Sequence, residues 1–137
     1  MPASASNYSI NGEQPQIVGC ECTSFCLLQH QEHGQVTDPA NIAYFEFSGQ
    51  WVRLYFDGNT IFWRSSDQPT VPANQTDASA LVLVNLSAMP GIVGRNLAAL
   101  EYWGTSTEVG ATLKFEDGST LAFRHLADHD KTLFRAG

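Results

Sequence analysis

The densest group of reactive side chains in the sequence is a cysteine and histidine cluster in its first quarter. It consists of Cys20, Cys22, Cys26, His30 and His33. If residues 25–33 form a helix, Cys26, His30 and His33 share one helical face, and a strand cysteine could complete four ligands for zinc. However, the spacing matches no standard zinc motif, and Cys20 and Cys22 alternate as buried strand residues do. We therefore expect these residues to be structural and to hold no metal.

Acid–base chemistry has two further candidate groups. A polar C-terminal segment contains the residue types of a catalytic triad: His125, Asp128, His129 and Asp130. No serine or cysteine stands in a nucleophile motif that would complete it. Glu46 and Glu101 could form a carboxylate pair of the glycosidase type, although pairing with Arg53 or Lys114 explains two strand carboxylates equally well. Neither group predicts an enzyme, and the sequence favours a protein without catalytic activity.

The charge balance restricts the class of partner. Seven Lys and Arg residues against 14 Asp and Glu residues give a net charge of −7. This charge opposes binding to nucleic acid phosphates and anionic lipids, and it attracts basic surfaces. Apolar runs such as Ala80–Val84 are much shorter than the roughly 18 to 20 residues of a membrane span. The sequence has no Gly-rich phosphate-binding loop, so we expect no cofactor. We expect the partner to be another protein or a second copy of the chain, not nucleic acid or a membrane.

The sequence also contains an internal repeat. Two blocks recur in the same order, with apolar residues replacing apolar residues: Asn41–Gly49 as Asn96–Gly104, and Asp57–Arg64 as Asp117–Arg124. Such self-similarity indicates duplicated architecture, but two copies are too few for a solenoid. We predict that residues 41–65 and 96–125 form two meanders related by a pseudo-twofold axis.

The elements that carry these repeats are short segments rich in aromatic and β-branched residues. The predicted strands are residues 17–23, 42–48, 51–56, 60–65, 81–86, 97–103, 111–115 and 120–125. The strands at 17–23 and 81–86 precede the two copies in equivalent places, which predicts a four-stranded unit used twice. The fold class is therefore all-β, with about eight antiparallel strands in a barrel or sandwich and at most one or two short helices.

The domain organisation follows from composition. Residues 1–15 contain almost no large apolar side chain and are predicted to form a flexible N-terminal arm. Residues 16–137 form a single β domain. Within it, residues 25–33 either make a short helix or continue the first strand through Leu28. Residues 67–79, rich in Pro, Ser, Thr and Asn, connect the two copies.

Hairpin turns set the register within each repeat. The first repeat has a two-residue turn at Asp57-Gly58, and the second is predicted to have a three-residue loop at residues 116–118 with Gly118 in the left-handed region. These turns place apolar residues opposite one another. The predicted cross-strand pairs are Leu54 with Ile61, Val52 with Trp63, Leu113 with Leu121, and Ala111 with Phe123.

This register divides the meanders into a core face and an outer face. The predicted core residues are Phe45, Phe47, Val52, Leu54, Ile61, Trp63, Leu100, Tyr102, Leu113, Leu121 and Phe123. The outer face of the second copy has ordinary surface residues such as Thr112 and Lys114. The outer face of the first copy instead combines aromatic rings with arginines, which is the composition of interaction hot spots. The candidate binding surface is Tyr44, Trp51, Arg53, Tyr55, Phe62 and Arg64.

Two functions remain open. The first is a non-enzymatic protein-interaction or binding module, in which another chain, a ligand or the protein's own segments cover the aromatic face; an acidic inhibitor or immunity-type protein for a basic partner fits the size and charge. The alternative is a small β-barrel enzyme or ligand-binding protein with a pocket at the barrel mouth, where Trp103, His125 and Glu101 would gather.

The cysteines give a testable expectation. Their odd number argues against a disulfide framework and favours a reducing, cytoplasmic environment. We expect purified protein to contain no stoichiometric zinc and three titratable thiols. Elemental analysis and thiol titration under denaturing conditions check this. About one metal ion per chain, or the loss of two thiols to a disulfide, would contradict it.

Overall fold

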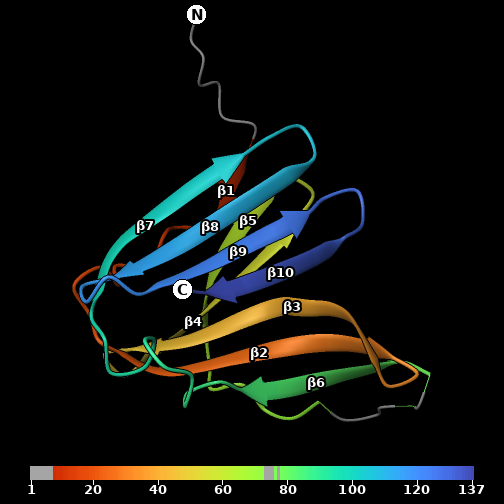
Figure 1. The fold of residues 1–137 in the computed structure, drawn as a ribbon, viewed down its shortest axis with the longest axis horizontal. Coiled ribbons are helices and arrows are strands. Elements are labelled where there is room, and N and C mark those ends of the chain that lie inside the picture. Colours follow the sequence, from red (N-terminus) through yellow and green to blue (C-terminus); the bar gives the residue numbers. More distant parts are fainter. Residues whose placement is uncertain (1–7, 73–75, 77) are drawn as a thin grey trace, which may run out of the picture.

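The fold consists of two β-sheets packed face to face. The computed structural model describes residues 8–72, 76 and 78–137, and all regular elements in this part of the chain are strands. The strands are β1 (Ser9–Asn11), β2 (Cys22–Glu32), β3 (Gln35–Phe47), β4 (Gln50–Asp57), β5 (Thr60–Ser66), β6 (Ala80–Asn85), β7 (Leu97–Gly104), β8 (Glu108–Phe115), β9 (Thr120–Leu126) and β10 (Lys131–Ala136). The all-β prediction is therefore confirmed, and the architecture is sandwich-like (Figure 1).

The two sheets differ in size. One has six strands in the order β1-β5-β4-β3-β2-β6, and the other has four in the order β10-β9-β8-β7. All neighbouring strands are antiparallel except β1 and β5. At one side β10 runs beside β3 (Figure 1), and the Thr132 N–H donates to Asp38 Oδ1 at 2.8 Å. This hydrogen bond links the two sheets.

Strand β2 corrects the short-helix prediction. Four consecutive residues, Phe25–Leu28, are buried, and such a run suits either a helix or a strand that is covered on both faces. β2 pairs with β3 along one edge and with β6 along the other, so it is a strand. Phe25 and Leu27 face the core, whereas Cys26 and Leu28 are buried on the other face. The strand predicted at residues 17–23 begins later than expected: turns around Gly19 at φ +90° occupy its first half, and β2 starts at Cys22.

Both repeat segments form antiparallel three-stranded meanders, β3-β4-β5 and β7-β8-β9. The predicted four-stranded unit does not recur, because β6 pairs with β2 on the far side from β3 and does not join β7. Pairing with β6 protects the long β2 edge, which would otherwise expose unpaired backbone groups. The pseudo-twofold relation between the two meanders stays a prediction.

The first hairpin turn lies one residue further along than predicted. Its loop is Gly58-Asn59, so Leu54 pairs with Trp63 and not with Ile61. Gly58 has φ +57°, as the mirror-image turns of two-residue hairpins require. The register therefore moves by two residues, which leaves each side chain on its predicted face.

The second hairpin has the predicted geometry. Leu113 pairs with Leu121 and Ala111 with Phe123, and Gly118 has φ +93°. The Phe115 N–H donates to Ser119 O at 2.8 Å, which closes the three-residue loop.

The core lies between the inner faces of the sheets. Phe45 is its centre, stacked on Phe25 at 5.0 Å between ring centroids and meeting Phe123 edge-on at 6.2 Å. The predicted core residues are buried, except for Leu100 and Tyr102, which are only partly buried. Tyr102 reaches the margin of the core because its hydroxyl has two polar partners: it accepts from Trp63 Nε1 at 2.9 Å and donates to Gln14 Oε1 at 2.6 Å.

The N-terminal segment includes ordered structure. Within the predicted flexible arm of residues 1–15, Ser9–Asn11 form β1 parallel to β5, whereas residues 1–7 lie outside the described residues. The Arg64 guanidinium donates to Asn11 O at 2.9 Å and to Asn11 Oδ1 at 2.6 Å. Polar contacts thus attach β1 to the sheet. The small number of large apolar side chains in residues 1–15 could not predict this attachment.

Substitution of Tyr102 by Phe tests the link between β5 and β7. It removes the hydroxyl that accepts from the indole N–H of Trp63, a residue that is 1% exposed. Leaving this donor unpaired costs about 1–3 kcal/mol. We expect that loss in the free energy of unfolding from urea denaturation, whereas Tyr55→Phe changes it little. Equal values for the two variants would contradict the assignment.

Candidate functional site

The six predicted binding residues lie on one face of the six-stranded sheet. Alternation along β4 points Trp51, Arg53 and Tyr55 away from the core, and each is half-buried. The register then brings in residues from both neighbouring strands: Tyr44 lies opposite Arg53, Arg53 opposite Arg64, and Tyr55 opposite Phe62. We call this set of six residues the aromatic face.

One half of the aromatic face is held together by its own contacts. The Tyr55 and Phe62 rings are stacked at 4.8 Å with an interplanar angle of 1°. The Arg64 guanidinium lies 5.4 Å from the Phe62 ring centroid while it donates to Asn11. These contacts restrict the side chains before any partner binds, which lowers the entropy lost on binding.

Arg53 lies between this half and the other half of the aromatic face, which contains Tyr44 and Trp51. It forms no hydrogen bond or ion pair with another residue in the described part of the chain. Its cross-strand neighbours are the second cation, Arg64, and the phenol of Tyr44. Burial raises the pKa of Tyr44, and the charge of Arg53 opposes that rise. The phenol is therefore neutral at physiological pH and leaves the charge of Arg53 uncompensated.

The segment after β5 crosses this face and leaves a hollow on each side of it. A cavity of about 370 Å³ is bounded by the sheet residues Leu28, Tyr44, Arg53 and Leu83 and by residues 66–70 and 72. A second cavity of about 300 Å³ contains Trp51. Asp67 and Gln68 line both cavities. The protein's own chain thus covers part of the aromatic face and shapes the remainder.

The cysteine and histidine cluster is dispersed along β2 and the segments before and after it. Cys22 and Cys26 are buried on opposite faces of β2, because they lie on opposite sides of a register shift. Burial raises the pKa of Cys22 to about 12 and also raises that of Cys26. His30 lies between Thr37 Oγ1 at 2.7 Å and Ser79 Oγ at 3.0 Å. In the described ranges, no group of three His, Cys, Asp or Glu side chains is arranged to hold a metal ion.

The carboxylate pair is ruled out by the layers of the sandwich. Glu46 lies on the outer face of the six-stranded sheet, where its Oε1 accepts from Thr23 Oγ1 at 2.8 Å. Glu101 lies on the outer face of the other sheet and pairs with Lys114 at 2.9 Å. The core separates the two carboxylates, so they cannot act on one substrate.

The predicted gathering of Trp103, His125 and Glu101 is also wrong. Trp103 and Glu101 lie on the outer face of β7, whereas His125 points into the core from β9 and is 1% exposed. The alternation of Leu121, Phe123 and His125 along β9 is the signal that could have placed His125 inside. The burial of His125 was not predicted, because the C-terminal segment was interpreted as a polar turn.

His125 is a buried titratable group with an incomplete set of partners. Its Nδ1 lies 2.8 Å from Thr132 Oγ1, and its ring stacks on Phe56 at 5.7 Å. Its Nε2 has no hydrogen-bond partner among the described residues, and Asp130 Oδ1 lies 4.0 Å from it. Burial lowers the pKa of His125, while the charges of Asp130, Asp38 and Asp57 oppose that shift. We infer that the imidazole is neutral at pH 7.

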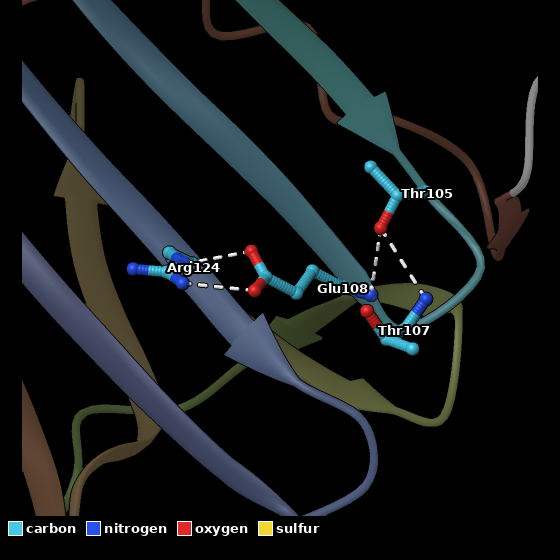
Figure 2. A network of polar contacts seen from close by, with 4 residues as sticks. All are labelled: Thr105, Thr107, Glu108 and Arg124. Carbon is cyan, nitrogen blue, oxygen red and sulfur yellow. Dashed lines mark hydrogen bonds and ion pairs between the residues drawn. The ribbon is translucent and has the colours of Figure 1, made fainter.

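Sequence reasoning missed one arrangement on the outer face of the four-stranded sheet. Trp103 in β7 lies directly opposite Gly110 in β8. Beside them Arg124 forms a bidentate ion pair with Glu108, at 2.7 Å to Oε1 and 2.8 Å to Oε2 (Figure 2). A glycine inside a strand often marks a close approach of another group, so Gly110 was the available signal.

Comparisons with known proteins do not add to these geometric assignments. No protein-family model, no curated protein and no solved structure matches this chain. In the part of the chain that the structure describes, no helix has the length and apolar character needed to cross a membrane.

His125 predicts how stability varies with pH. Its pKa in the folded protein lies below the ordinary value of 6.5. Just below pH 6.5 the histidine therefore binds a proton more readily in the unfolded chain than in the folded protein. The free energy of unfolding should therefore be constant above about pH 7 and fall as the pH drops through 6.5. Asp38, whose pKa is raised by burial, acts in the opposite direction at lower pH, so measurements belong between pH 7.5 and 5.5.

The matched variants are His125→Gln and His129→Gln. The first should abolish the fall in stability between pH 7.5 and 5.5, since glutamine does not titrate and can still hydrogen-bond Thr132. The second removes an exposed histidine and should leave the fall in place. Urea denaturation at each pH measures both. A fall that survives in His125→Gln would show that another group causes it.

Proposed function

We propose that this protein is a non-enzymatic interaction module and that the aromatic face is its contact surface. The partner is another protein that places a carboxylate against Arg53. The proposal rests on one observation: a half-buried arginine lies among aromatic rings and opposite a second arginine, and it forms no ion pair with any described residue.

The energetic argument starts from the arginine pair. Like charges directly opposite each other on neighbouring strands are destabilising, and a half-buried cation has lost part of its hydration. A carboxylate brought by a partner relieves both effects and forms charge-assisted hydrogen bonds. Arginine and aromatic residues are also the side chains that contribute most at interfaces. Binding would therefore be strongest where Tyr44, Arg53 and Trp51 meet the partner.

The overall charge of the chain acts at longer range. A net charge of −7 attracts a partner with a basic surface over distances near the Debye length of about 10 Å, before specific contacts form. A carboxylate at the centre of that basic surface would then bind Arg53. A basic protein with a local acidic group satisfies both requirements, and this chain would act on it as an acidic inhibitor.

Substitutions on equivalent strands separate binding from folding. Arg53 and Lys114 lie on the outer faces of the middle strands of the two meanders, opposite Tyr44 and Ala99. The chain and its variants Trp51→Ala, Arg53→Glu and Lys114→Glu are used as baits in extracts of the source cells, and the affinity for each captured protein is measured by titration calorimetry. We expect Trp51→Ala and Arg53→Glu to weaken binding at least tenfold, about 1.4 kcal/mol or more. Lys114→Glu should bind as the unsubstituted chain does.

Thermal unfolding and sedimentation complete the test. All three variants should stay folded and lose at most about 1 kcal/mol in the free energy of unfolding, because the substituted side chains lie on outer faces and Lys114 loses only a surface ion pair. Partners that bind all four baits equally would contradict the proposal. So would a dimer of the chain that Arg53→Glu dissociates, because the occupant of the aromatic face would then be a second copy.

A further inference from the structure

The outer face of the four-stranded sheet carries a separate aromatic platform. Trp103 is 37% exposed and is the one aromatic residue among the exposed large hydrophobic side chains of the described residues. Its indole covers Gly110, since a Cβ added at that glycine would clash with Trp103 Cε2, Nε1 and Cζ2. One side of the indole is therefore packed against β8, and its exposed area lies on the side that faces away from the sheet.

The platform borders a hollow of about 380 Å³. Its lining residues are Trp103, Ala122, Phe123, Arg124, Leu133, Phe134 and Arg135. The row across the sheet runs from Trp103 through Gly110 and Arg124 to Leu133, and the adjacent row includes Ala122. The indole occupies the space above Gly110, and the small side chain of Ala122 lowers the floor between the indole and β10, which leaves room for a ring-sized group.

The polar groups beside the hollow are oriented before a ligand binds. The bidentate pair with Glu108 holds the Arg124 guanidinium in one plane, and Thr105 Oγ1 accepts from the N–H groups of Thr107 and Glu108 at 3.3 and 3.1 Å (Figure 2). Arg135 lines the same hollow and forms no ion pair with any described residue. Two arginines against one glutamate give this region an excess positive charge on a chain whose net charge is −7.

We propose that this hollow binds an acidic saccharide, a sugar ring that carries a carboxylate. The C–H face of a pyranose ring packs on the negative π-face of the Trp103 indole. Arg124, which its ion pair with Glu108 holds in place, donates from its remaining N–H groups to ring hydroxyls, and Arg135 pairs with the carboxylate. A neutral sugar would leave Arg135 without a partner. An extended acidic peptide has no flat ring face to pack against the indole. The site lies on the opposite side of the molecule from the aromatic face and is independent of the function proposed for it.

Titration calorimetry with defined oligosaccharides tests the assignment. The probes are oligogalacturonate, oligomannuronate and oligoglucuronate, each matched with its uncharged counterpart of the same length. We expect at least one acidic oligosaccharide to bind, and to bind at least tenfold more tightly than its uncharged counterpart. Trp103→Ala should weaken that binding at least tenfold. Arg135→Gln should reduce the preference for the acidic sugar, and Trp51→Ala, on the other sheet, should have no effect.

Three further measurements separate loss of the indole surface from loss of folding. Gly110→Ala keeps the indole but displaces it from the sheet, so it should weaken binding as well, while the indole N–H resonance of Trp103 should shift on titration of the unsubstituted chain. Trp103→Phe keeps a smaller aromatic surface and should bind with intermediate affinity. The proposal is overturned if no acidic oligosaccharide of the panel binds, if uncharged sugars bind equally well, or if Trp103→Ala folds and binds normally.

Discussion

The structure depends on the contact between the inner faces of two sheets, which meet around Phe45. Phe25 stacks on this ring from within the same sheet and Phe123 approaches it from the other sheet, so one aromatic group joins both layers. Burial of apolar area is the main favourable term in folding, and here the inward positions of both meanders supply it. Because these positions serve packing, side chains for recognition have to lie on the outer faces. The aromatic face and the Trp103 platform are the outer surfaces of the two layers.

The alternation of apolar and other residues was sufficient to predict the fold class and the core-facing side of the two meanders. Leu113 and Leu121 were paired correctly because a three-residue loop was the one that matched apolar side chains across the hairpin. The loop at Gly58-Asn59 was misplaced because two turn positions give the same side-chain faces, and periodicity cannot separate them. Phe25–Leu28 were ambiguous for a related reason: one face of β2 packs into the core, and the other borders residues 66–70 and 72, which are distant in sequence.

The candidate site was predictable only where it follows from local pattern. Comparison of the two repeats placed Arg53 and its aromatic neighbours on one face, because strand alternation fixes that face. The path of residues 66–72 across Tyr44 and Arg53 could not be derived, since it results from β6 joining β2 and not β7. The burial of His125 was hidden by the polar residues that follow it. The packing of Trp103 on Gly110 could not be predicted, because it depends on the register between β7 and β8, which the repeat did not specify.

The inner face of the six-stranded sheet maintains the fold, and we infer that its outer face is available for contact. Adjacent residues of β4 test this most directly, because Leu54 points inward with 1% exposure and Tyr55 points outward and is half-buried. Urea denaturation of Leu54→Ala should show a loss of about 2–5 kcal/mol in the free energy of unfolding. Tyr55→Ala should lose about 1 kcal/mol, mainly from its stacking on Phe62. A loss for Tyr55→Ala as large as that for Leu54→Ala would mean that the outer face is a second core, and it would contradict the account.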